Sequence, residues 1–91
     1  MRKEVHCKVS GRVQLVMFRD YARRKANLLK IDGTVKNMPD GSVEIVAQGE
    51  EAWLKRFVDF LHRGPALANV EHVDAAWQDP TEELEGFKIM H

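Results

Sequence analysis

The spacing of the apolar residues changes repeatedly along the chain, and these changes limit the folds that it can adopt. Over residues 5–9 apolar and polar residues alternate, which is typical of a strand with one buried face. Over residues 17–29 the apolar residues recur at helical spacing, so that Phe18, Ala22 and Ala26 lie on one side of the predicted helix. The same two patterns then predict strands at 33–37 and 42–48, a helix at 50–63, and strands at 70–77 and 86–90.

The order of these elements predicts one α+β domain that spans residues 1–91. Strand, helix, strand, strand, helix and strand in this order form the ferredoxin-like split βαβ plan (βαββαβ), here with a short fifth strand. In this plan an antiparallel sheet carries both helices on one face. On the second helix we expect the core-facing stripe to consist of Trp53, Phe57, Phe60 and Leu61.

This plan brings two distant segments to one edge of the sheet. The strands at 5–9 and 33–37 run in the same direction with the strand at 42–48 between them, so their ends lie about 10 Å apart. Gly11 is expected to end the first strand, and the loop after it then faces Asn37, the last residue of the second strand. The gap between them suits one phosphate-sized group.

The charge balance and the cysteine content argue against several function classes. The 91 residues include 14 Lys and Arg against 14 Asp and Glu, which does not favour a dedicated binder of nucleic acid or of anionic membranes. The first and third predicted strands also lack the exposed aromatic cluster of an RNA-recognition module. A single cysteine, no secretory signal and no apolar run of about 20 residues favour a cytoplasmic protein, which we expect to be a monomer. The four histidines lack the spacing of a zinc site, and we expect no cofactor.

The loop after Gly11 leads into the N-terminus of the first helix, where backbone N–H groups lack helical partners and the helix dipole is positive. Arg19, in the first turn, opposes this dipole unless an anion lies between them. In one interpretation the loop amides and the Arg19 guanidinium bind the same phosphate. In the other, Arg19 is a solvated residue paired with Asp20, and one short loop with a glycine does not decide between the two.

Asn37 also has two interpretations. An asparagine at the end of a strand commonly caps a turn, and the Asp40-Gly41 pair that follows has hairpin chemistry. Alternatively, the neutral amide of Asn37 holds a water molecule, since one end of an amide donates and the other accepts hydrogen bonds. Such an amide positions a water molecule but cannot remove its proton.

Two segments resemble motifs of the acylphosphatase family. GRVQLVMFR resembles the family signature G-x-V-Q-G-V-x-F-R, and DGTVKNMPDGSVEIVAQG resembles the second motif, G-x-V-x-N-x-x-D-G-x-V-E. The similarity continues through HRGP and LEGFKI, and so covers nearly the whole chain. The resemblance implies the ferredoxin-like fold and hydrolysis of the carboxyl–phosphate bond of a small-molecule acyl phosphate, without a metal and without a covalent intermediate.

The same resemblance implies roles for individual residues. Arg19 would bind the phosphate of the substrate, or a phosphate or sulfate ion in its place, and Asn37 would orient the attacking water. The remaining contacts to phosphate would come from the backbone N–H groups of the loop, which are those of Arg12, Val13, Gln14, Leu15 and Val16.

The chain departs from the family signature at Leu15, where the signature has a glycine in the middle of the loop. Glycine permits a positive φ and lets a ligand approach the backbone closely. If φ is positive at this position, leucine costs about 1 kcal/mol or more and tilts the neighbouring N–H groups. If φ is negative, the side chain only borders the pocket. We expect weakened but not abolished hydrolysis; the alternative is an anion-binding or protein-binding module that has lost the chemistry.

Overall fold

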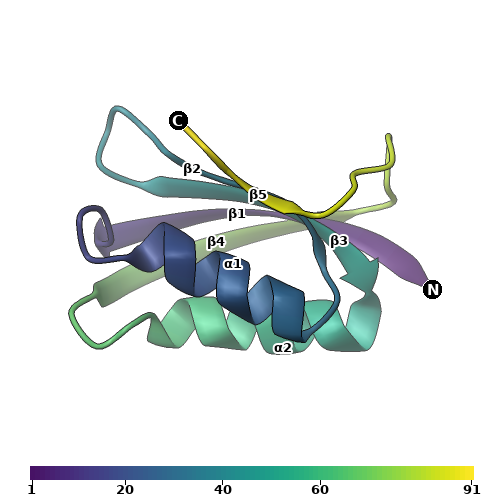
Figure 1. The fold of residues 1–91 in the computed structure, drawn as a ribbon, viewed down its shortest axis with the longest axis horizontal. Coiled ribbons are helices and arrows are strands. Elements are labelled where there is room, and N and C mark those ends of the chain that lie inside the picture. Colours follow the sequence, from purple (N-terminus) through teal and green to yellow (C-terminus); the bar gives the residue numbers. More distant parts are fainter.

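The structure, a computed structural model, describes residues 1–91, and its elements follow the predicted order (Figure 1). None of its helices combines the length and the apolar character needed to cross a lipid bilayer. The strands are β1 (Arg2–Arg12), β2 (Asp32–Asn37), β3 (Val43–Glu50), β4 (Asn69–Gln78) and β5 (Phe87–Met90), and the helices are α1 (Phe18–Leu28) and α2 (Glu51–Arg63).

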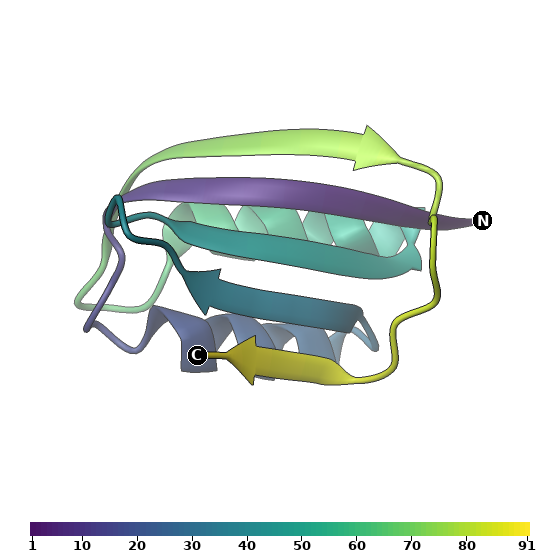
Figure 2. The same cartoon turned by 90° about the horizontal axis from the view of Figure 1, so that it is seen from above.

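The five strands form one sheet in the order β4-β1-β3-β2-β5, with both helices on the same face (Figures 1 and 2). The pairs β4–β1, β1–β3 and β3–β2 are antiparallel, which confirms the predicted ferredoxin-like α+β fold. The short β5 instead runs parallel to β2, so the complete sheet is mixed rather than wholly antiparallel. The reason is the connection after β4, which crosses to the edge where β2 begins, so that β5 starts there too (Figure 2).

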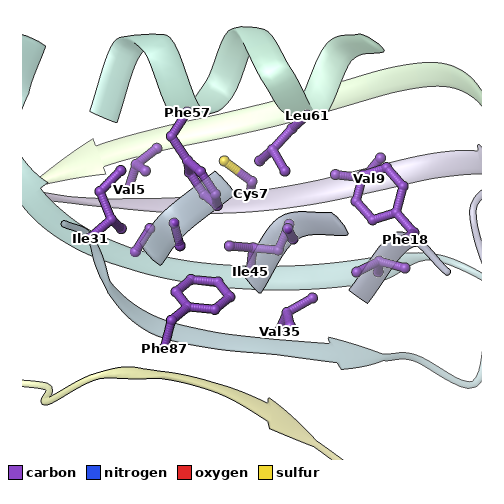
Figure 3. Close-up of a cluster of buried hydrophobic side chains, with 14 of the residues drawn as sticks. Val5, Cys7, Val9, Phe18, Ile31, Val35, Ile45, Phe57, Leu61 and Phe87 are labelled. Carbon is purple, nitrogen blue, oxygen red and sulfur yellow. The ribbon is translucent and has the colours of Figure 1, made fainter. Parts of the chain in front are cut away.

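Alternate residues of β1 form the middle of the core, as predicted. Val5, Cys7 and Val9 are at most 2% exposed, and Figure 3 shows Phe57 and Leu61 of α2 next to them. Burial raises the pKa of the Cys7 thiol to about 12, so it stays protonated and unreactive at neutral pH. This face of the sheet therefore contributes to stability and not to chemistry.

On α2 the core-facing residues are Leu54, Phe57 and Leu61, all fully buried, and the prediction for Trp53 was wrong. Trp53 is 45% exposed. Leu54, Phe57 and Leu61 share one side of the helix, and the residue before Leu54 is rotated by about 100° from it. Phe60 is half-buried at the border of the same side.

The face of the sheet opposite the helices is crossed at one end by residues 79–86, which cover a buried polar pair. The Gln48 amide donates hydrogen bonds to Glu4 Oε1 (2.6 Å) and to the Glu82 carbonyl, and its oxygen accepts one from the Leu84 N–H (3.0 Å). Burial raises the pKa of Glu4, but the hydrogen bonds it accepts, first the one from Gln48, outweigh burial and hold that pKa below its ordinary value. Gln48 therefore joins the sheet to the segment that leads into β5.

Gln48→Ala is expected to lower the free energy of unfolding by about 2 kcal/mol, because it removes one of the hydrogen bonds to the buried Glu4 carboxylate and leaves the Glu82 carbonyl and the Leu84 N–H without the Gln48 amide. Chemical denaturation at pH 7 measures the loss. A carboxylate with a lowered folded-state pKa stabilises the fold above its unfolded-state pKa, and this stabilisation disappears as the pH falls through the folded-state value. The difference between wild type and variant should therefore shrink in acid.

The control is Glu44→Ala, which removes an exposed carboxylate from the same face of β3. Its effect should stay within about 0.5 kcal/mol. Equal losses in the two variants would contradict a special role for Gln48.

Candidate active site

A pocket of about 200 Å³ lies at the edge of the sheet where β1 and β2 end. It is bordered by the loop that follows β1, by the N-terminus of α1 and by the end of β5 (Figure 2). A larger hollow, of about 530 Å³, contains Lys3 and Asp79, but these two charges are paired with each other. The smaller pocket is the one that contains both Arg19 and Asn37; its lining residues are Val13, Leu15, Met17, Phe18, Arg19, Asp20, Asn37, Ile89 and His91.

The loop begins after a local irregularity in β1. The strand continues past Gly11 to Arg12, beyond its predicted end, because its register against β4 shifts between Ser10 and Gly11. A Cβ atom at Gly11 would lie 2.2 Å from the Asn69 carbonyl oxygen, and φ there is +120°. Only glycine fits this position, which directs the chain out of the sheet and over the pocket.

The backbone N–H groups of residues 13–17 donate to no backbone carbonyl. They precede the first turn of α1, so they add to the unpaired donors that every helix N-terminus presents. Unpaired donors beside a positive helix end are suited to bind an anion. The loop therefore has the donors that the phosphate interpretation requires.

The sign of φ at Leu15, which the sequence left open, is positive in the structure. Its φ is +61°, and Met17, which precedes α1, has a φ of +64°. Each non-glycine residue in this left-handed region costs roughly 1–2 kcal/mol. The Leu15 side chain is 99% exposed, so no burial offsets its strain.

Three other side chains hold the loop in place. Val13 and Val16 are 1% and 5% exposed and anchor it in the core. Gln14 Nε2 donates hydrogen bonds to the carbonyls of Met38 and Ser42, each at 2.8 Å, and so ties the loop to the turn between β2 and β3. The sequence predicted only a backbone role for Gln14. Its polar side chain among apolar neighbours was the available signal for this second role.

Arg19 makes no ion pair within the chain. Asp20 is instead paired with Arg23 at 2.7 Å and with Arg24 at 3.1 Å, which excludes the interpretation of Arg19 as the partner of Asp20. Arg19 Nη1 lies 3.4 Å from His91 Nδ1, a neutral acceptor at most. A half-buried guanidinium in the pocket thus has no anionic partner of its own.

Asn37 is the last residue of β2 and faces the pocket. Its Oδ1 is the one buried side-chain nitrogen or oxygen atom in the structure without a hydrogen-bond partner. An unsatisfied buried acceptor costs roughly 1–3 kcal/mol, so its position calls for a ligand or a water molecule. The interpretation of Asn37 as a self-capping turn residue does not account for this free oxygen.

Asp40 carries out the turn chemistry instead. Its Oδ1 accepts hydrogen bonds from the backbone N–H (2.9 Å) and the hydroxyl (2.6 Å) of Ser42, and Lys8 Nζ lies 2.9 Å from its Oδ2. The hydrogen bond from the Ser42 hydroxyl, followed by the one from Lys8, lowers the pKa of Asp40. Asp40 is thus a hairpin residue, as predicted, and leaves the Asn37 amide available to the pocket.

Sequence reasoning missed the part of the pocket that β5 supplies. The pairing of Lys36 with Met90 brings the residues that follow them, Asn37 and His91, to the same edge of the sheet. Ile89 and His91 therefore line the pocket beside residues from the first half of the chain. A strand of four residues carries too short a pattern to reveal its partner. No group of three or more His, Cys, Asp and Glu side chains is arranged to hold a metal ion.

Leu15→Gly is expected to raise the free energy of unfolding by about 1 kcal/mol, since it relieves the left-handed strain and removes no buried contact. Urea denaturation of the two proteins measures the gain. The matched control is Leu67→Gly at another exposed leucine, whose φ is not positive. There glycine only adds freedom to the unfolded chain and should lower stability by about 0.5–1 kcal/mol. The same sign of change in both variants would contradict the strain at Leu15.

Comparison with known proteins identifies the family. The acylphosphatase family model matches residues 5–89. An acylphosphatase of Thermococcus kodakarensis is 42% identical over 89 residues, 98% of this chain and 97% of the relative, and one of Salinibacter ruber is 41% identical over 87 residues, 96% and 92% of the two chains. The crystal structure of acylphosphatase from Bacillus subtilis matches with a TM-score of 0.95 and 34% identity, over 98% of this chain and 99% of that one. The chain belongs to the acylphosphatase family.

Proposed function

We propose that this chain hydrolyses acyl phosphates to a carboxylate and inorganic phosphate in the pocket between the loop and Asn37. One observation carries the proposal: a guanidinium without an anionic partner and a buried amide oxygen without a hydrogen-bond partner line the same small pocket. The first can bind an anion, and the second can accept a hydrogen bond from a polar ligand such as water. A phosphate group and an attacking water molecule supply both.

In this proposal the phosphate lies against the loop. The Arg19 guanidinium and the N–H groups of residues 12–16 donate hydrogen bonds to the phosphate oxygens, and those of residues 13–16 are free of backbone partners. Charge develops on these oxygens during phosphoryl transfer, and fixed donors that need no reorganisation stabilise it best. Gln14 is a positioning residue, because its two hydrogen bonds hold the loop against the turn after Asn37.

The water molecule is proposed to bind the Asn37 amide and to attack phosphorus on the side opposite the acyl oxygen. The bond between phosphorus and that oxygen breaks, and its electron pair leaves on the carboxylate. Asp20, the one carboxylate side chain lining the pocket, is paired with two arginines and is not free to act as a base. We therefore assign the proton of the water to a phosphate oxygen of the substrate, so the protein contributes position and electrostatic stabilisation.

Asn37→Ala is expected to lower kcat on the order of 100-fold with a smaller effect on KM, because it removes the group that orients the water and leaves the phosphate contacts. Steady-state hydrolysis of benzoyl phosphate measures both constants. Asn37→Asp retains the shape but brings a negative charge to the phosphate, and should be no better than alanine. Unchanged turnover in Asn37→Ala would refute the water-orienting role.

Arg19→Ala is expected to lower kcat/KM on the order of 1,000-fold and to abolish binding of inorganic phosphate, because it removes the only cationic group without an ion-pair partner in the pocket. Arg19→Lys should restore part of the loss, since an ammonium keeps the charge but not the two-pronged geometry. Phosphate titration followed by NMR measures binding separately from turnover.

The control is Arg56→Ala, which removes an exposed arginine of α2 that does not line the pocket. It should retain phosphate binding. A phosphate affinity unchanged in Arg19→Ala would refute the assigned role.

A further inference from the structure

Two large apolar side chains project from the loop at the mouth of the pocket. Leu15 is 99% exposed and Met17 is 67% exposed, and both are among the lining residues. Between and behind them lie Val13 and Val16, which are buried and turned into the core. The loop therefore presents its apolar side chains alternately to the core and to the solvent above the pocket.

The fold gives no reason for these two side chains. Both residues have a left-handed backbone that disfavours non-glycine residues, and their exposure means that they contribute little burial to stability. Strained positions of this kind cluster at sites of function, and the inference runs from the observed strain to a role. Here the role is assigned to something that enters the pocket, because both residues line it.

The parts of the substrate that are already assigned to other groups indicate what contacts Leu15 and Met17. The phosphate is assigned to the loop N–H groups and Arg19, and the attacking water to Asn37. The acyl group, on the opposite side of phosphorus from the water, is the part of the substrate that these groups leave without contacts. Apolar surfaces brought together at the mouth of a pocket are stabilised in proportion to the area removed from water.

We propose that Leu15 and Met17 form an apolar rim that binds the acyl group and favours acyl phosphates with an aromatic or branched aliphatic acyl group over those with a short one. This inference rests on the proposed function and names its substrate class. Ile89, which is half-buried, adds apolar surface to the same pocket. Leu15 is then a determinant of specificity, with a cost in backbone strain, rather than only a defect in the loop.

The experiment compares kcat/KM for benzoyl phosphate and acetyl phosphate in the wild type, Leu15→Asn, Met17→Asn and the double variant. Asparagine tolerates the left-handed conformation and replaces the apolar surface with a polar one, so the backbone of the loop is retained. The readout is the ratio of kcat/KM for benzoyl phosphate to kcat/KM for acetyl phosphate. The two substrates differ in intrinsic reactivity, but this difference affects the ratio equally in every variant. The double variant should lower the benzoyl-to-acetyl ratio on the order of tenfold, and each single variant by less.

Leu15→Gly provides a second test, because it removes the side chain and the strain together. Relaxed N–H groups should raise kcat/KM for acetyl phosphate, as expected if leucine weakens the phosphate contacts, while the benzoyl-to-acetyl ratio falls. Leu67→Asn, at an exposed leucine outside the pocket, is the control and should leave the ratio unchanged.

The outcomes distinguish a failure of the proposed function from a failure of the apolar rim. If the wild type hydrolyses neither substrate, the proposed function fails and the rim fails with it. If both substrates are hydrolysed and the ratio is the same in the wild type, the double variant and Leu15→Gly, the proposed function stands and the rim is overturned. A ratio that falls in all pocket variants and stays constant in Leu67→Asn supports the inference.

Discussion

The packing of both helices against one face of the sheet is the interaction on which the rest of the structure depends. Val5, Cys7 and Val9 of β1 and Val43, Ile45 and Ala47 of β3 are buried there, and the residues between them lie on the opposite face. A shift of one residue in register would reverse both sets, so this burial fixes how the strands pair. It also fixes that β1 and β2 end at the same edge, which is why residues 13–17 and Asn37 border one pocket.

Much of this arrangement could be predicted from the sequence because it follows from local patterns. The change between two-residue and helical spacing gave the element order, and the order gave the common edge of the Gly11 loop and Asn37. The motifs around Arg19 and Asn37 added the family, which the comparisons confirm. The roles of these residues stay predictions until hydrolysis and phosphate binding are measured.

The features that could not be predicted depend on contacts between distant segments or on single torsion angles. Trp53 has the apolar character of a core residue, and only the neighbouring helix and sheet decide that Leu54 is buried in its place. The four residues of β5 are too few to show that they pair with β2. The φ of Leu15 is set by the anchors on either side of it, Val13 and Val16, and not by leucine's own preference.

The pocket and the rest of the structure differ in whether their buried polar groups have hydrogen-bond partners and in whether their backbone is strained. The core side chains are closely packed, and the buried Glu4 has hydrogen-bond donors around it. At the pocket, by contrast, Asn37 Oδ1 lacks a partner and two loop residues have strained backbones. Unpaired and strained groups persist only where the packing around them holds them in place. The same packing keeps the pocket in a conformation that can bind a ligand.

The parallel pairing of β5 with β2 has a consequence for how the pocket comes into existence. Val13 follows the first strand and Ile89 lies in the last, so the pocket is lined by residues that are far apart in the sequence. Contacts of such long sequence separation form slowly, because the loop entropy is lost before they are made. The pocket is therefore complete only when the sheet is complete, and acquisition of activity during refolding reports the final closure of the sheet rather than the earlier formation of its helices.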